Sequence, residues 1–211
     1  MELILGSQSP RRRELLERMG LDFRVVTAEI DETKFETEDP EESVRRICRE
    51  KALAVARLLP QSERRLVLTA DTIVVLDGRI LGKPHDAAEA EAMLAALSGR
   101  EHAVYTAFTL LPVGETQNAA CKMQHAMTHC EKTLVRFRAL TGAEIAAYVA
   151  TGEPMDKAGA YGIQGRGMML VESINGDYFT VVGLPVCRLA QALKGFGFFR
   201  DQGLGTGEAK R

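Results

Sequence analysis

The sequence has no excess of charge and no long apolar run. Its 27 Lys and Arg residues nearly balance 29 Asp and Glu residues, which leaves a formal net charge of −2. A protein that coats nucleic acid is broadly basic, so we expect no nucleic-acid partner and only local anion sites. No apolar stretch reaches the roughly 18 residues that a membrane span needs, and the first residues lack the pattern of a signal peptide. We therefore expect a cytoplasmic protein without a membrane partner.

Cysteine is scarce, and two common motifs are absent. None of the 4 cysteines lies in a C-x-x-C pair, so we expect reduced thiols. The segment CKMQHAMTHC at 121–130 holds two Cys and two His. Its spacing matches no common zinc motif and favours a half-exposed strand over a metal site. The sequence also has no G-x-x-x-x-G-K-[ST] loop, which excludes a P-loop nucleotide hydrolase as the obvious interpretation.

What is present is the balance of a globular chain: 211 residues, of which 45% are hydrophobic and 27% charged. The spacing of apolar residues predicts an α/β fold. Strands are predicted at 2–6, 22–28, 66–76, 101–112, about 119–137 and 168–173, and helices at 10–19, 41–58, 86–98, 142–151 and about 184–194. Because the sequence shows no internal repeat and no linker, we expect residues 1–200 to form one domain. The Gly-rich, charged tail at 201–211 is expected to be disordered.

The turn after the first predicted strand is the strongest local signal. Ser9 stands where a helix N-cap is expected, and Pro10 stands at the first helical position. Arg11, Arg12 and Arg13 follow in the first helical turn, where the helix dipole disfavours positive charge. Guanidinium groups beside the N–H groups of a helix start can bind phosphate oxygens, so the turn predicts an anion site. The alternative is a solvated basic helix start.

Lys51 interrupts the apolar face of the helix predicted at 41–58, where it falls on the same stripe as Val44. A lysine on a buried helix face is costly unless its charge is met, which favours a lysine directed at an anion. The alternative is that its apolar stem carries the charge to the surface.

Asp71 interrupts the apolar run LVLTADTIVVL at 66–76 in the same way. An ionised carboxylate inside a sheet needs a metal, a cation or a reaction, unless it caps nearby backbone N–H groups. The dipeptide Asp77-Gly78 is a hairpin signal, and the hairpin would return Lys83 to the neighbourhood of Asp71.

Seven stretches form an ordered set that spans nearly the whole chain. They are LGSQSPRRRELL at 5–16, REKA at 49–52, ADTIV at 70–74, GKP at 82–84, LSG at 97–99, GEPMDKAGAYGIQG at 152–165 and ESINGDYFTVVGLP at 172–185. In this order they resemble the Maf family of nucleoside triphosphate pyrophosphatases, also known as septum-formation inhibitor proteins. The segment at 114–130 departs from the family pattern. Each stretch alone is a weak signal, and their common order is what makes the resemblance specific.

The resemblance implies a fold like that of inosine-triphosphate pyrophosphatases: a mixed, elongated sheet flanked by helices, with two lobes around a deep cleft. It implies hydrolysis of a nucleoside triphosphate to the monophosphate and pyrophosphate, assisted by Mg²⁺ or Mn²⁺. The run DKAGAYGIQG at 156–165 resembles the family branch that prefers dTTP and UTP, whereas the branch acting on 7-methyl-GTP has cysteine in place of Lys157. Cleavage of modified nucleotides and a homodimer are further expectations.

The resemblance also assigns roles to single residues. A phosphate-binding role falls on Ser7, Arg11 and Arg12. A catalytic role falls on Glu32, Lys51, Asp71, Lys83 and Gln164, with Asp71 and Glu32 also as metal ligands. The loop around Glu32 matches the family only loosely.

These residue types suit the chemistry on their own terms. Cleavage between the α and β phosphates needs positive charge near several oxygens, a metal and an activated water. Asp71 and Glu32 can hold the metal, position the water, or do both. The cations that can meet the phosphates are Arg11, Arg12, Lys51 and Lys83. The alternative is a non-enzymatic, nucleotide-sensing regulator of cell division, in which carboxylates beside the cations would repel the ligand unless a metal joined them.

Overall fold

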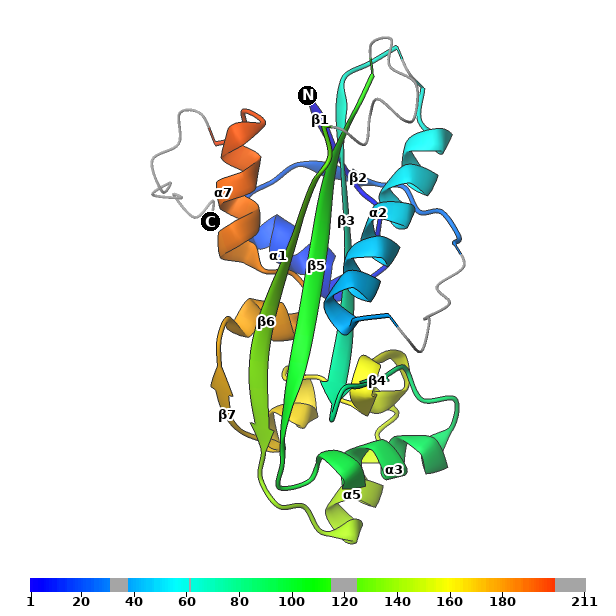
Figure 1. The fold of residues 1–211 in the computed structure, drawn as a ribbon, viewed down its shortest axis with the longest axis vertical. Coiled ribbons are helices and arrows are strands. Elements are labelled where there is room, and N and C mark those ends of the chain that lie inside the picture. The colour runs from blue at the N-terminus through cyan, green and yellow to red at the C-terminus, as the bar shows by residue number, and fades with distance from the viewer. Residues whose placement is uncertain (31–37, 61, 115–124, 200–211) are drawn as a thin grey trace, which may run out of the picture.

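The computed structural model describes residues 1–30, 38–60, 62–114 and 125–199. These residues build one mixed sheet of seven strands, in the order β2-β1-β3-β5-β6-β7, with β4 paired to β3 (Figure 1). β1 is parallel to β2 and β3, and the pairings β3–β4, β3–β5, β5–β6 and β6–β7 are antiparallel. The strands are β1 Glu2–Leu5, β2 Phe23–Val25, β3 Arg65–Leu76, β4 Arg79–Leu81, β5 Glu101–Val113, β6 Met127–Phe137 and β7 Val171–Asn175.

Helices cover both faces and the far end of this sheet. α2 begins after Asp39, whose Oδ1 accepts hydrogen bonds from the N–H groups of Glu41 and Glu42 at 2.9 and 3.3 Å. The α-helices are α1 Pro10–Arg18, α2 Pro40–Leu58, α3 Ala87–Leu97, α5 Gly142–Val149, α6 Tyr178–Val182 and α7 Val186–Gly195. Three 3₁₀ helices complete the described elements: η1 Glu153–Asp156, η2 Ala158–Ala160 and η3 Gly165–Met169.

The central strand β3 is buried on both faces because its side chains alternate between two layers of helices. Leu66 and Leu68 pack in a cluster that includes residues of α1 and α7. Val67, between them, packs in a second cluster with residues of α2. Burial along β3 is broken at two adjacent positions, Asp71 and Thr72, which are partly exposed. The apolar run of the sequence is therefore a true core strand with a polar opening in its middle.

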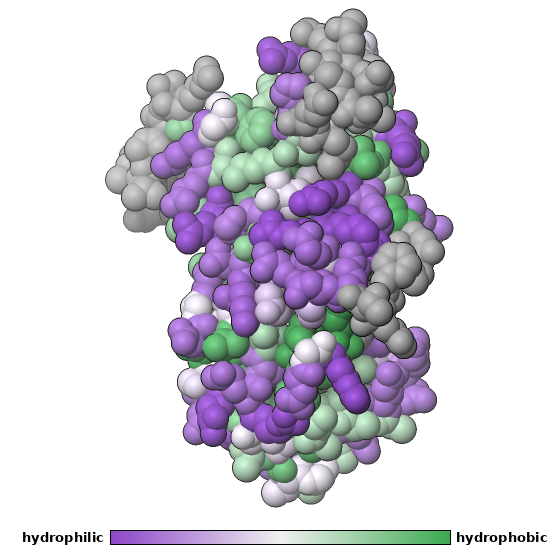
Figure 2. Space-filling model, viewed as in Figure 1, coloured by the Kyte–Doolittle hydropathy of each residue, from purple (hydrophilic) through white to green (hydrophobic). Residues whose placement is uncertain are grey.

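The two ends of the sheet have separate surroundings. α1, α2 and α7 pack around one end, whereas α3 and α5 lie at the other (Figure 1). The second end has its own apolar cluster, to which α3, α5 and the 3₁₀ segment contribute Leu94, Leu97, Ile145 and Ala160. On the face shown in Figure 2, hydrophilic residues gather in a band across the middle of the molecule. This division corresponds to the two lobes that the resemblance implies.

The predicted mixed sheet flanked by helices is confirmed, and the predicted hairpin at 77–78 joins β3 to β4. The strand predicted at 168–173 is wrong in its first half, because residues 165–169 form η3 and β7 begins at Val171. α6 was not predicted. The expected tail at 201–211 lies outside the described residues, and the limits of the domain at 1–200 stay a prediction. No helix in the described part of the chain is long and apolar enough to cross a membrane.

One helix cap gives a pH-dependent contribution to stability. At the start of α5, Thr141 Oγ1 accepts from the Glu144 N–H, and Glu144 Oε2 accepts from the Thr141 N–H. The Arg138 guanidinium, which donates to Glu144 Oε1 at 2.7 Å, and the Thr141 contacts lower the pKa of Glu144 from 4.5 to about 2.

We expect Glu144→Gln to lower the melting temperature at neutral pH, because the ionised carboxylate is the form that these donors stabilise. A depressed folded-state pKa stabilises the fold above pH 4.5 and loses this effect as the pH falls toward 2. Thermal melts of both proteins across this range should therefore converge at low pH. Glu91→Gln, on the exposed surface of α3, is the matched control. A difference that does not change with pH would contradict the proposed origin.

Candidate active site

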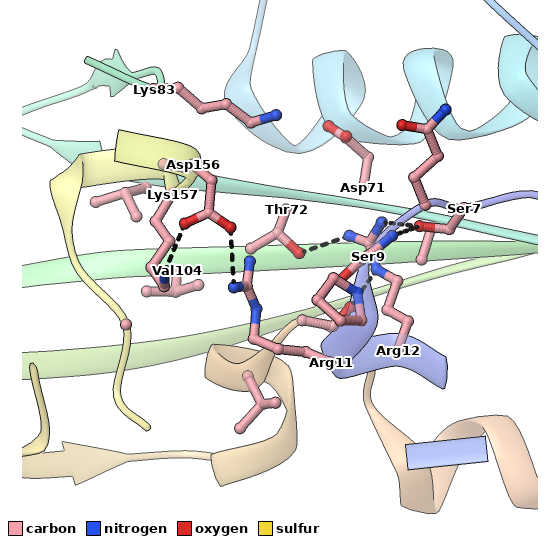
Figure 3. Close-up of a pocket in the computed structure, with 18 of the residues that line it drawn as sticks. Ser7, Ser9, Arg11, Arg12, Asp71, Thr72, Lys83, Val104, Asp156 and Lys157 are labelled. Atoms are coloured by element: carbon pink, nitrogen blue, oxygen red, sulfur yellow. Dashed lines mark hydrogen bonds and ion pairs between the residues drawn. The ribbon is translucent and has the colours of Figure 1, made fainter. Parts of the chain in front are cut away.

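A cavity of about 830 Å³ opens where the burial of β3 is interrupted. One wall is built by the turn after β1, the start of α1 and a side chain of α2. The facing wall comes from the segment that links η1 to η3, far along the chain (Figure 3). The residues that line the cavity include Ser7, Arg11, Arg12, Lys51, Asp71, Thr72, Lys83, Asp156, Lys157, Tyr161, Gly162, Ile163, Gln164 and Gly183.

A close backbone approach fixes the turn after β1. The Gly6 N–H donates to the Leu68 carbonyl of β3 at 2.8 Å. A Cβ on Gly6 would lie 2.6 Å from the Thr69 side chain, so only glycine allows this contact. Ser9 is the residue before α1, as predicted, but its side chain makes no capping hydrogen bond. Its N–H instead donates to the Ser7 hydroxyl at 3.3 Å, which holds the turn closed.

Arg12 is held in the cavity wall by neutral acceptors. Its Nε donates to the Gly183 carbonyl at 2.9 Å and its Nη1 donates to the Ser7 hydroxyl at 3.0 Å. Its Nη2 donates to the Thr72 hydroxyl at 3.2 Å. All three acceptors are neutral, and together they fix the orientation of the guanidinium at the cavity wall. An oriented cation of this kind is suited to bind an anion.

A chain of hydrogen-bonded hydroxyl groups runs from Arg12 into the core. Thr106 Oγ1 donates to the Thr180 carbonyl at 2.7 Å, which uses its single proton. The 2.9 Å contact between the hydroxyls of Thr72 and Thr106 must then have Thr72 as donor. Thr72 is left to accept from Arg12, so the direction of every bond in the chain is fixed. Thr106 and Thr180 are fully buried, which makes this chain part of the core.

Lys51 and Asp71 form an ion pair across the interface of α2 and β3. Lys51 Nζ lies 2.8 Å from Asp71 Oδ1, and the two side chains are 16% and 14% exposed. Both residues line the cavity. Lys51 thus faces an anion of the protein itself, the Asp71 carboxylate, and its role toward a bound ligand stays a prediction. The alternative in which Lys51 only snorkels to the surface is wrong.

An ionic chain crosses the cavity from one wall to the other. Arg11 Nη1 lies 3.4 Å from Asp156 Oδ2, and Lys157 Nζ lies 2.5 Å from Asp156 Oδ1 (Figure 3). Burial alone would raise the pKa of Asp156, but the hydrogen bond and charge of Lys157, together with Arg11, hold it below its usual value. Asp156 was not predicted as a site residue, although it opens the DKAGAYGIQG run that the sequence marks as specific.

The remaining predicted residues have different standings. Lys83 follows β4, is exposed, lines the cavity and points toward Asp71 in Figure 3, as the hairpin predicted. Gln164 lies on the facing wall, before η3. Glu32 lies outside the described residues, so its catalytic and metal-binding roles stay predictions. The structure thus gathers at one cavity every predicted site residue that it describes.

The described residues contain no group of three or more His, Cys, Asp or Glu side chains placed to hold a metal ion. In the segment at 121–130, Cys121 lies outside the described residues, and His129 is paired with Glu131 at 2.9 Å. β6 begins at Met127, so residues 125–126 are not part of the strand that was predicted from about 119. The expectation that the segment binds no metal stays a prediction. The cysteines described are free thiols, of which Cys48 is buried and Cys187 exposed.

Comparison with known proteins bears on this cavity. The family model described as "Maf-like protein" matches residues 2–196. The chain belongs to the Maf family. A dTTP/UTP pyrophosphatase of Symbiobacterium thermophilum is 50% identical over 197 residues, which cover 93% of this chain and 95% of that protein. The protein of the same name from Pelotomaculum thermopropionicum is 49% identical over 93% of this Maf-family chain and 97% of its own.

Solved structures give a weaker likeness. A nucleoside-triphosphatase (dITP/XTP pyrophosphatase) from Mycobacterium abscessus aligns over 93% of this chain and 96% of its own, with a TM-score of 0.42 and 15% identity. The Ham1 protein of Staphylococcus aureus aligns over 93% of this chain and 100% of its own, with a TM-score of 0.44 and 14% identity. The description of the fold therefore rests on the sheet and helices of this Maf-family chain itself.

The ion pair gives a prediction for stability. We expect Lys51→Met to lower the free energy of unfolding, because it leaves the half-buried Asp71 carboxylate without its cation. The loss should be roughly 1–3 kcal/mol, between the values for exposed and for buried pairs, and should lower the melting temperature by several degrees. Lys83→Met, which removes the same charge from an exposed position, should leave the melting temperature nearly unchanged. A more stable Lys51→Met protein would mean that the pair does not form.

Proposed function

We propose that this protein hydrolyses dTTP and UTP to the nucleoside monophosphate and pyrophosphate. The observation that carries the proposal is the placement of Arg12 and of the Lys51–Asp71 pair on one cavity. Cations there can meet a triphosphate, and a carboxylate lies beside them. Relatives that share about half of their residues with this chain over 93% of its length are named dTTP/UTP pyrophosphatases, which supports the same choice of substrate.

The cavity wall built by the first turn suits the phosphates. Arg12 enters it already oriented, and the hydroxyl of Ser7 and the guanidinium of Arg11 lie beside it. Preorganised donors stabilise charge that develops during a reaction without paying for reorientation at that moment. Lys83, exposed at the edge of the cavity, can move to the leaving pyrophosphate.

Asp71 is the group that distinguishes hydrolysis from binding. Water must attack a phosphorus atom while the bond between the α and β phosphates breaks, and its proton must leave. Asp71 can take that proton, or it can hold a metal ion and position the water, and both roles stay open. In a nucleotide sensor without catalysis, a carboxylate at this position would weaken the attraction of its partner Lys51 for the phosphates. The presence of Asp71 therefore favours the enzyme over the regulator of cell division.

We also propose that Mg²⁺ or Mn²⁺ assists the reaction. Magnesium is commonly held by one or two carboxylates together with substrate phosphates, so the Asp71 carboxylate fits an ion that enters with the nucleotide. Glu32 would be the second ligand. When bound, such an ion neutralises phosphate charge and makes its coordinated water more acidic. Activity on modified nucleotides, a homodimer and a cytoplasmic location are further predictions of this proposal.

A panel of nucleoside triphosphates tests the function. With Mg²⁺ or Mn²⁺, the purified protein should release pyrophosphate from dTTP and UTP faster than from dCTP, dATP and GTP. Asp71→Asn should reduce this turnover by roughly 10²–10⁴-fold. Asp77→Asn, in the exposed turn between β3 and β4, is the matched control and should stay active. Release of orthophosphate, or binding of dTTP without turnover, would contradict the proposal.

The buried hydroxyl chain gives a second test. Thr106→Val keeps the shape of the side chain but removes the acceptor of Thr72, so Arg12 loses part of its support. We expect kcat/KM for dTTP to fall by about 3- to 10-fold, the worth of one buried hydrogen bond. Thr106→Ser restores the hydroxyl and should restore most of the rate. Equal kcat/KM in Thr106→Val and the wild type would mean that Arg12 does not depend on this chain.

A further inference from the structure

The wall that faces the cations has little regular structure of its own. Tyr161, Gly162, Ile163 and Gln164 line the cavity there, between η2 and η3. This stretch is followed by η3, a 3₁₀ helix of 5 residues. Helices this short have too few internal hydrogen bonds to define a conformation alone. Something outside the stretch must therefore hold it in place.

One carboxylate outside the cavity lining does so. Glu153 Oε2 accepts from the Arg166 N–H at 2.9 Å, and its Oε1 accepts from the Gly167 N–H at 3.1 Å. Burial alone would raise the pKa of Glu153, but these backbone donors hold it below its usual value. The ionised side chain of η1 thus captures the first residues of η3. This capture anchors one end of the cavity wall.

Tyr148 of α5 anchors the other end. Its hydroxyl lies 3.0 Å from Glu153 Oε1, and a carboxylate can only accept, so the hydroxyl donates. The Tyr148 hydroxyl oxygen also accepts a hydrogen bond from the Gly162 N–H at 3.3 Å. Tyr148 is 5% exposed, so this bond lies within the core. Gly162 and η3 are therefore tied to one pair, the partly exposed Glu153 and the buried Tyr148.

Two glycines of this segment leave no room for a side chain beside Glu153 and Tyr148. Gly165 has a φ of +65°, and a Cβ there would lie 2.8 Å from Glu153 Oε2. A Cβ on Gly167 would lie 2.1 Å from the Gly162 carbonyl oxygen and 2.7 Å from the Tyr148 hydroxyl. A side chain at either position would push the segment off the carboxylate. The backbone is thus built to close on Glu153.

The main chain of Glu153 also holds a residue of the cavity wall, Lys157. The Glu153 carbonyl accepts from Lys157 Nζ at 2.6 Å, and Lys157 lines the cavity beside Gly162. A Cβ on Gly162 would lie 2.8 Å from Lys157 Cε, so the two are in close contact. The position of this wall is therefore set jointly by the side chain and the carbonyl of Glu153.

We propose that Glu153 and Tyr148 are positioning residues that determine which nucleoside the cavity accepts. This inference rests on the proposed function: if the phosphates bind at Arg12 and Lys51, the nucleoside must meet the opposite wall. Neither residue lines the cavity, so both act through the stretch that they hold. Their effect should therefore fall on the choice of nucleoside and leave the grip on the phosphates intact.

Glu153→Gln is the sharpest variant, because it keeps the shape but places an amide N–H₂ against backbone donors. Tyr148→Phe removes the hydroxyl and keeps the ring. For each variant, kcat/KM should be measured for dTTP, dCTP and dATP, together with inhibition by inorganic tripolyphosphate. We expect kcat/KM for dTTP to fall by about 10-fold, with a smaller change for dATP, so that the discrimination ratio falls. Inhibition by tripolyphosphate should change by less than about 2-fold.

Glu172→Gln, an exposed change on β7, is the matched control and should alter neither ratio nor inhibition. An equal loss of kcat/KM for every nucleotide, or an unchanged ratio, would overturn the proposal. Hydrogen exchange of the peptide that spans 161–167 provides a readout that does not need turnover. It should become faster in both variants, and unchanged exchange would also overturn the proposal. If the wild type hydrolyses no pyrimidine triphosphate, the proposed function fails, whereas the exchange measurement still tests the positioning.

Discussion

The ion pair between Lys51 and Asp71 is the interaction on which this architecture depends. β3 is buried on both faces, and a carboxylate in its middle would be costly if no cation met it. α2 supplies that cation from 2.8 Å, while its apolar residues pack over the same strand. The core can therefore open at Asp71 and Thr72 without collapsing. The cavity opens at this pair, and both side chains line it.

The two walls of the cavity are stabilised by different means. Arg12 is oriented at its wall by a carbonyl and two hydroxyls. The opposite wall is held by Glu153, an anion placed outside the cavity lining. The ion pair of Arg11 and Asp156, at 3.4 Å, bridges the two walls. The two walls are therefore held in place by separate sets of contacts.

Much of the fold was predictable because its signals are local. The alternation of Leu66, Val67 and Leu68 within an apolar run marks a core strand, and Asp77-Gly78 marks the turn that follows it. The prediction failed at 168–170, because Met168 and Met169 belong to η3 (165–169) but, with Leu170, look like part of the strand that follows. Hydrogen bonds from this segment to Glu153 decide its conformation, and no local pattern contains them. α6 was missed because a helix of 5 residues rich in β-branched side chains has no helical periodicity to detect.

The sequence by itself determined the residue types of the site and the membership of the Maf family. It placed arginines after a strand, a lysine on an apolar helix face and an aspartate inside an apolar run. The partner of each charge was decided by the tertiary structure alone. Lys51 and Asp71 are 20 residues apart, Arg11 and Asp156 are 145 apart, and Arg12 and Gly183 are 171 apart. Such pairs form only when the chain folds, because only packing brings groups so far apart in the sequence within a few ångströms of each other.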